Sequence, residues 1–148
     1  MEFEDSVTVE ADKEHLWEMI SDPEMLVSCV PGAKEVERIS ETEYSGVIER
    51  GLGGITVALN GEVEITEMDA PDHLEAEATG EDKKTNSRLD ATAQMHMNAT
   101  GETQTELEYY IDLDFTGRLA SLGARIVKRK ISSDIGTYFD NIQSEAES

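Results

Sequence analysis

The chain of 148 residues is long enough for one folded domain, and its formal net charge is −21. Phosphate binding requires a basic surface, so this charge argues against a nucleic-acid partner. The single cysteine, Cys29, excludes an intrachain disulfide and a cysteine-based metal cluster. The charged N-terminus does not resemble a signal peptide, and no apolar run approaches the length of a membrane span. We therefore expect one domain over residues 1–148, located in the cytoplasm.

The acidic composition also bears on the environment of the protein. Asp and Glu number 33, against 12 Lys and Arg. A net charge this high normally favours disorder, but the clean periodicities described below indicate a folded domain with a heavily carboxylated surface. Such a surface suits concentrated salt, which screens charge repulsion over short distances. The composition therefore suggests a halophilic cytoplasm, and an ordinary acidic protein is the alternative.

The N-terminal part of the chain predicts one strand followed by two short helices. Residues 3–9 alternate in polarity, as a half-buried strand does. Asp12 is a candidate N-cap for the first helix. Asp22 followed by Pro23 predicts the start of the second helix, because proline is favoured at the first helical position. Two short helices here would leave a notch in the sheet that a later helix could cover.

The middle of the chain predicts six further strands. Residues 80–84 read as a polar hairpin tip, and Ala99 falls on the inward phase of its strand. The last strand alternates without error. With the N-terminal strand these segments make seven, and they lie at residues 35–39, 44–50, 55–65, 74–80, 89–99 and 103–116.

The last third of the chain predicts one long amphipathic helix over residues 117–142, with Thr116 as its N-cap. At about 1.5 Å per residue this helix would be roughly 40 Å long. A strand of 14 residues would span about 45 Å. Elements of such similar reach predict an α+β fold in which a curved antiparallel sheet grips the helix. Residues 144–148 are expected to fray.

Small inward residues on two strands predict a cavity under this helix. They are mostly alanine and glycine, and small side chains leave unfilled volume unless the helix lies very close. Ligand pockets are mostly apolar, and methionine adapts to irregular shapes, so the void would hold a hydrophobic small molecule. The alternative is that the alanines only allow the helix to approach. The predicted entrance lies near residues 30–32 and 51–54. The predicted lining is Trp17, Leu26, Val30, Tyr44, Ala91, Ala93, Met95, Met97, Tyr109, Ile111, Leu122, Gly123 and Ile126.

The sequence does not display a catalytic constellation. His15, His73 and His96 fall at expected surface positions, and none has a nucleophile at a telling spacing. The carboxylates fall on the outward phases of their strands, where no pocket can shift a pKa. We interpret Cys29 as a buried inert thiol and not a reactive one. No catalytic residue, metal ligand or cofactor is predicted.

One segment breaks the acidic pattern. Residues 117–133 include no acidic residue. Local pairing with surrounding carboxylates is one interpretation, and each exposed pair would contribute little. The other is a docking face for an acidic partner protein or for anionic lipid headgroups. The basic residues concerned are Arg118, Arg125, Lys128, Arg129 and Lys130.

Several motifs resemble the CoxG family of carbon monoxide dehydrogenase subunits. The resemblance extends over residues 3–142, and its most specific part lies between Asp22 and Ala33. It implies the START-like helix-grip fold of the SRPBCC superfamily, with an apolar cavity between the sheet and the C-terminal helix. The motifs are Asp22-Pro23-Glu24, Leu26, Cys29-Val30-Pro31-Gly32-Ala33, Tyr44-Ser45-Gly46, Gly61 and Gly117-Arg118-Leu119-Ala120-Ser121-Leu122-Gly123.

The resemblance also implies a function beside molybdenum-containing CO dehydrogenases or related hydroxylases, in membrane recruitment and handling of a lipophilic quinone. Our first hypothesis is therefore a non-enzymatic accessory domain that binds a lipid or a menaquinone-like quinone. Several family members carry a C-terminal membrane anchor, whereas this chain ends at Ser148, so we expect any membrane contact to be peripheral. Because the superfamily includes cyclases and hydrolases, an enzyme that uses Tyr44, Tyr109 or Cys29 is one alternative. A docking module that uses the basic segment is another.

Overall fold

The computed structural model describes residues 1–52 and 54–147 and contains seven strands and three α-helices. The first helices, α1 and α2, lie between β1 and β2. A 3-10 helix, η1, joins β7 to α3. In chain order the elements are β1 (Glu2–Val9), α1 (Lys13–Ile20), α2 (Pro23–Ser28), β2 (Ala33–Arg38), β3 (Glu43–Leu52), β4 (Ile55–Asp69), β5 (His73–Asp82), β6 (Ser87–Gly101), β7 (Gln104–Thr116), η1 (Gly117–Leu122) and α3 (Ala124–Glu147).

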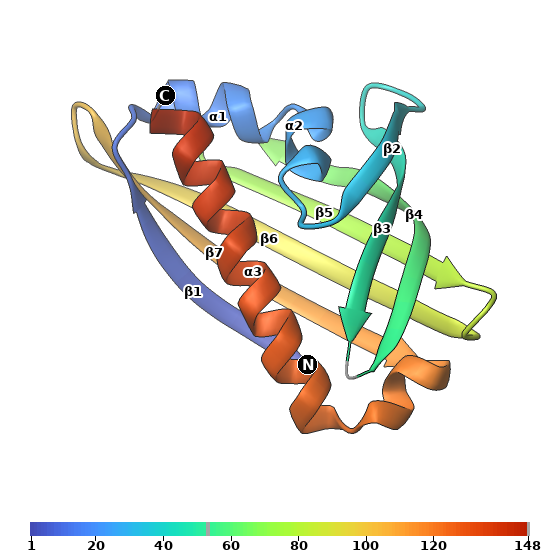
Figure 1. Cartoon of the computed structure of the whole chain (residues 1–148). Helices are drawn as coiled ribbons and strands as arrows, with labels where there is room; N and C mark the ends of the chain where they lie inside the picture. The colour runs from blue at the N-terminus through green and yellow to red at the C-terminus, as the bar shows by residue number, and fades with distance from the viewer. Residues whose placement is uncertain (53, 148) are drawn as a thin grey trace.

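All seven strands form one antiparallel sheet in the order β1-β7-β6-β5-β4-β3-β2. From β2 to β7 each strand pairs with the next one in the chain, and β1 closes the order by pairing with β7. The sheet is curved, α3 crosses its concave face, and α1 and α2 lie at one end of it (Figure 1). The predicted α+β helix-grip fold is confirmed.

Local sequence explains the two short helices. The Asp12 carboxylate accepts a hydrogen bond from the backbone N–H of His15 (3.1 Å), and Asp22 does the same for Glu24 (3.0 Å). These bonds satisfy amides that have no partner within the helix. Leu16 is fully buried, and α1 packs against α3, β6 and β7.

The predicted single helix over residues 117–142 is wrong, because the chain breaks at Gly123. This residue has φ of 94°, a conformation that residues with a side chain rarely adopt. Thr116, the predicted N-cap, makes no side-chain capping bond to η1. The apolar spacing did not reveal the break, because both kinds of helix bury every third or fourth residue. The predicted fraying is also wrong for residues 144–147, which belong to α3, and residue 148 lies outside the described residues.

Two details of the strands also differ from the predictions. The β5–β6 turn lies at residues 83–86, since residues 80–82 continue the strand. The Asp82 carboxylate ends that strand by accepting hydrogen bonds from the backbone N–H groups of Ala58 and Lys84, both at 3.0 Å. Ala99 is exposed and does not face the core, because the β6–β7 hairpin extends past the end of α3 (Figure 1).

The core has a main cluster and a smaller satellite. The main cluster joins the sheet to α1, α2 and the second half of α3, and it includes fully buried Leu74, Leu107 and Ile142. The satellite contains Leu119 of η1 and buried side chains of β4. Among the described residues, no helix combines the length and apolar character needed to cross a bilayer.

Candidate functional site

A cavity of about 280 Å³ lies between α3 and the concave face of the sheet. Side chains from α2, β3 to β7, η1 and α3 border it, so both core clusters contribute to its wall. Ligand pockets commonly measure about 300–1,000 Å³. The cavity is therefore at the small end of this range and suits a compact hydrophobic group.

The register of β5 on β6 produces the hollow. Ala76 pairs with Ala93, and Ala78 pairs with Ala91. All four alanines border the cavity, so they form a continuous floor of methyl groups beneath α3. A packed interior would carry bulky side chains at such positions. Two strands that are small at the same level therefore leave space that neither strand would leave alone.

The cavity also has a charged edge. Arg50 of β3 forms an ion pair with Asp134 of α3, and its Nε lies 3.0 Å from Asp134 Oδ2. The two side chains are only 27% and 18% exposed. Tyr138 lies one turn further along α3, and burial raises the pKa of its hydroxyl. The edge thus offers a guanidinium, a carboxylate and a neutral phenol to a polar group on an otherwise apolar ligand.

Removal of one partner of this ion pair tests its contribution to stability. We expect Asp134→Ala to lower the free energy of unfolding by about 1–3 kcal/mol, because the Arg50 guanidinium would stay half-buried without a partner. Glu49→Ala is the matched control, since Glu49 pairs with Lys34 in the open, where the side chains are 50% and 48% exposed. That control should cost less than about 1 kcal/mol. Urea unfolding measures both, and equal losses would refute the argument.

Six of the thirteen residues predicted to line the cavity border it. They come from α2, the loop after it, β6 and β7, which are the segments where alternation and burial agree. The predicted entrance near Val30 includes two bordering residues, Val30 and Pro31, whereas Gly53 of the other predicted segment lies outside the described residues. The six are Leu26, Val30, Ala91, Ala93, Met95 and Ile111.

Four of the other predicted residues belong to solid parts of the interior. Met97 is fully buried in the main cluster, and Trp17 packs on that cluster from α1. Tyr109 stacks on Phe139 with ring centroids 3.8 Å apart, and only Phe139 of the pair borders the cavity. Tyr44 is buried on β3 with 1% exposure. Alternation identified the correct face of each strand but not the level at which the interior becomes hollow.

The remaining three predicted residues surround the break between η1 and α3. Leu122 packs against the satellite cluster, and the position of Gly123 meets no neighbouring atom within 4 Å. Ile126 is 50% exposed. A continuous helix would have directed these residues at the sheet, and the turn at Gly123 changes their direction.

Sequence reasoning missed the polar residues of the cavity. Arg50 shares the inward phase of β3 with Tyr44 and Ile48, so the alternation already contained the signal. Asp134 follows the acid-free segment and lies between two apolar residues of the inner face, Ile131 and Ile135, both of which border the cavity. An inward charge on a strand and an inner-edge charge on a helix are worth pairing in such sequences.

The polar candidates named for an enzyme, Tyr44, Tyr109 and Cys29, do not border the cavity. Cys29 is 5% exposed, and burial raises the pKa of its thiol. Burial also raises the pKa of the Tyr109 hydroxyl. A raised pKa reduces the thiolate population, and thiolate is the reactive form of cysteine.

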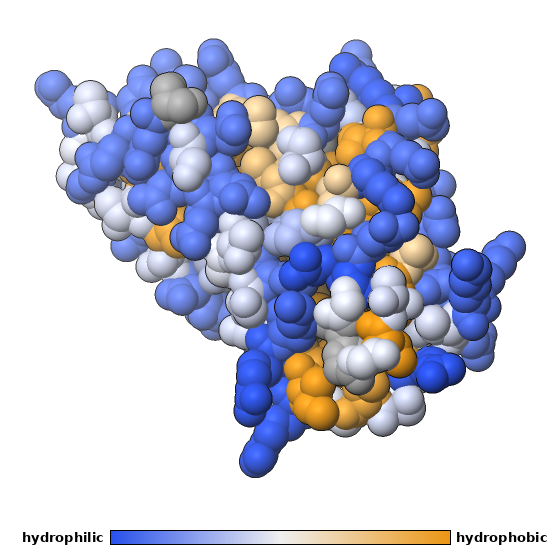
Figure 2. Space-filling model, viewed as in Figure 1, coloured by the Kyte–Doolittle hydropathy of each residue, from blue (hydrophilic) through white to orange (hydrophobic). Residues whose placement is uncertain are grey.

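The five basic residues of the acid-free segment lie on η1 and the first two turns of α3. Four are exposed, and Lys130 is half-buried. Within residues 1–52 and 54–147, none of the five takes part in an ion pair. Figure 2 shows hydrophobic surface at this end of the molecule, where exposed Ile126 lies. The segment therefore combines unpaired positive charge with apolar surface.

A curved seven-stranded sheet that holds one long helix over an apolar cavity defines the class of START-like helix-grip domains. A conserved protein from Geobacillus kaustophilus has this fold with a TM-score of 0.88 and 23% identity, covering 99% of this chain and 95% of that chain. A START superfamily protein from Mycobacterium smegmatis matches with a TM-score of 0.72 and 12% identity, covering 99% and 97%. The Zhui aromatase/cyclase from Streptomyces sp. R1128 matches with a TM-score of 0.70 and 12% identity, covering 99% and 93%. At these identities the likeness concerns the fold alone.

Residues 6–147 match the CoxG family of carbon monoxide dehydrogenase subunits. The chain belongs to this family, and the resemblance noted in the sequence is confirmed. None of the curated proteins matches the chain.

Proposed function

We propose that the protein is a non-enzymatic accessory domain that binds a hydrophobic small molecule between its sheet and α3. The observation that carries the proposal is the cavity of about 280 Å³ with its floor of four alanines. Transfer of an apolar ligand from water into such a space is favourable in proportion to the apolar area that it buries. The family and the fold support a ligand-binding role.

The ligand that fits this site best is lipid-like or quinone-like. Its apolar part would lie over Ala91 and Ala93, and a carbonyl or hydroxyl group would face Arg50 and Tyr138 at the charged edge. Guanidinium and phenol groups both donate hydrogen bonds, so they suit a quinone oxygen. A long tail exceeds the volume of the cavity and would extend out of it.

Two measurements test ligand binding. Native mass spectrometry of the protein purified from its own host should show a co-purifying hydrophobic molecule, and organic extraction should release it. Titration of the stripped protein with a short-tailed menaquinone analogue should then saturate at one molecule per chain. Failure of quinone, fatty-acid and phospholipid probes to bind would contradict the proposal.

Family membership supports a partner as well. We propose that the ligand-bound domain works beside a CO dehydrogenase-type molybdenum hydroxylase. Tagged protein recovered from its host should then carry molybdenum, as measured by elemental mass spectrometry, in stoichiometric amount. Recovery without molybdenum, under conditions in which the hydroxylase is expressed, would remove this part of the proposal and leave ligand binding intact.

We further propose that the basic segment docks the domain on an anionic lipid surface. The net charge of −21 opposes such an approach, but charges beyond about 8 Å are screened at physiological salt. The five unpaired basic residues therefore dominate the field at their own end of the molecule. Exposed Ile126 can enter the headgroup region beside them.

Charge reversal tests the docking surface. The double variant Arg125→Glu and Arg129→Glu should reduce co-sedimentation with phosphatidylglycerol vesicles at least about tenfold, because each basic residue near the surface contributes about 1 kcal/mol. The matched control is Lys83→Glu with Lys84→Glu in the β5–β6 turn, which makes the same change in net charge elsewhere. Equal loss in the two double variants, or equal binding to neutral vesicles, would contradict the proposal.

A further inference from the structure

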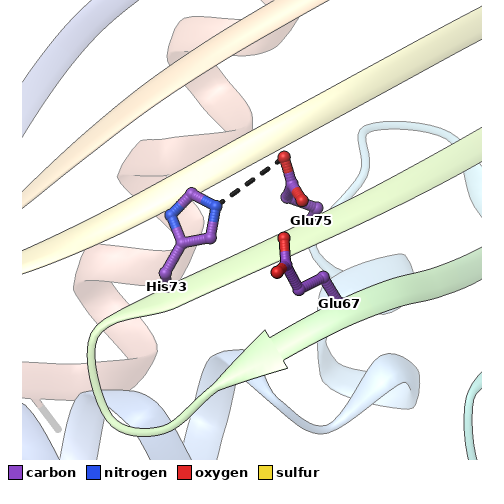
Figure 3. A group of neighbouring side chains, drawn as sticks. All are labelled: Glu67, His73 and Glu75. Atoms are coloured by element: carbon purple, nitrogen blue, oxygen red, sulfur yellow. Dashed lines mark ion pairs between the residues drawn. The ribbon is translucent and has the colours of Figure 1, made fainter.

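A histidine and two glutamates converge on the convex face of the sheet, opposite the cavity. Glu67 of β4 and His73 and Glu75 of β5 point toward one another (Figure 3). The Nε2 atom of His73 lies 3.7 Å from Oε1 of Glu75. One ligand atom from each of the three residues lies within 4.8 Å of the other two. Three side chains of metal-ligating type therefore already face a common point.

A β-bulge brings Glu67 into this group. Ile65 pairs with Ala76, whereas Glu67 pairs with Glu75, so the register shifts by one residue between them. Without the bulge Glu67 would oppose Leu74 and share the inward phase of Ile65. With it, Glu67 stands directly beside Glu75 on the outer face. Bulges of this kind commonly redirect a side chain at a functional position.

The two carboxylates are unfavourably close without a cation. Like charges directly opposite one another destabilise a strand pair. A hydrogen bond to Glu75, followed by its charge, raises the pKa of Glu67. In the part of the chain that the structure describes, neither carboxylate forms an ion pair with a lysine or arginine. The pair is thus held together by the sheet and not by a compensating basic side chain.

The imidazole distinguishes this cluster from the other acidic surface of the protein. His73 pairs with His96 of β6, and their rings lie 5.8 Å apart at 52°. His96 therefore packs beside His73 and limits the positions that its ring can take. A mixed set of imidazole nitrogen and carboxylate oxygen favours zinc and other first-row transition metals, whereas calcium and magnesium prefer oxygen ligands alone.

We propose that Glu67, His73 and Glu75 form a binding site for Zn²⁺ or a similar divalent transition metal ion. In a tetrahedral site with bonds of about 2.0–2.1 Å, ligand atoms lie roughly 3.3 Å apart. The pair of His73 and Glu75 is already near that separation, and Glu67 closes the site by rotation of its side chain. Water would complete the coordination on the open side. The ion would link β4 to β5 on the face that α3 leaves uncovered, and the site is independent of ligand binding in the cavity.

Calorimetric titration of the chelator-treated full chain with ZnCl₂, at neutral pH and high NaCl concentration, tests the site. We expect one Zn²⁺ per chain and a rise in melting temperature on binding. His73→Gln and Glu75→Gln should each weaken binding more than about tenfold. Circular dichroism verifies the fold of both variants, and either folded variant is sufficient for the test.

The control uses a pair of glutamates without a histidine. Glu64 pairs with Glu43 on the outer face of β3 and β4, so Glu64→Gln removes the same charge from a similar neighbourhood. It should leave zinc affinity unchanged. Several weak sites that respond equally to Glu64→Gln and His73→Gln would overturn the proposal, because they would indicate non-specific binding to carboxylates. Magnesium binding as tight as zinc binding would overturn it as well.

Discussion

Ala93→Phe is expected to weaken the binding of a hydrophobic ligand by at least about tenfold while the protein remains folded. Ala93 lies in the cavity floor, between its partners Ala76 on β5 and Ile111 on β7. A phenyl ring at this position would project toward α3 and occupy much of the 280 Å³. Since the space is already present, the ring can enter it with little displacement of the backbone. The ligand and the ring would then compete for the same volume.

The measurement is a titration with the menaquinone analogue, accompanied by circular dichroism and thermal unfolding. Ala99→Phe is the matched control, because Ala99 lies on the same strand and the same phase but is exposed beyond the end of α3. It should bind ligand as the unmodified protein does. Unchanged affinity in a folded Ala93→Phe variant would show that the ligand binds elsewhere.

Phe139→Ala is expected to lower the free energy of unfolding by about 3–5 kcal/mol, a large part of the 5–15 kcal/mol typical of a domain. Phe139 is 1% exposed. Its ring stacks on Tyr109 at 3.8 Å and meets the edge of Tyr138 at 5.1 Å. It also borders the cavity, so it separates the hollow part of the interior from the solid main cluster. Its removal would extend the hollow into the core.

Chemical denaturation measures this effect. Ile126→Ala on the same helix provides the control, because a side chain that is 50% exposed makes little difference to stability, within about 0.5 kcal/mol. A loss below about 1 kcal/mol in Phe139→Ala would mean that the cavity wall collapses to fill the space. The helix would then be a mobile cover and not a fixed wall.

The cavity and the docking segment have consequences for each other. Arg50 and Asp134 connect β3 to the middle of α3, while the basic segment begins on η1 and the first turns of the same helix. A lipid surface that contacts this segment would therefore act on the helix that forms one wall of the ligand site. We expect ligand transfer to anionic vesicles to be slower in the Arg125→Glu and Arg129→Glu variant than in the unmodified protein.

The sequence by itself determined the strands, the short helices and the face of each element that turns inward. Alternation and helical spacing are local properties, since the backbone geometry of a strand or helix decides which neighbours share a face. The caps at Asp12 and Asp22 are local for the same reason. The family motifs were readable for that reason too, because they occupy short continuous segments such as Cys29-Val30-Pro31-Gly32-Ala33.

The tertiary structure alone decided where the interior is hollow and which residues meet across it. The floor depends on the register that sets Ala76 against Ala93. The charged edge joins Arg50 and Asp134, which are 84 positions apart. The turn at Gly123 and the bulge before Glu67 each redirect side chains that a regular pattern would have placed elsewhere. Such features arise from the fit between distant segments, and the periodicity of one segment carries no information about its distance from another.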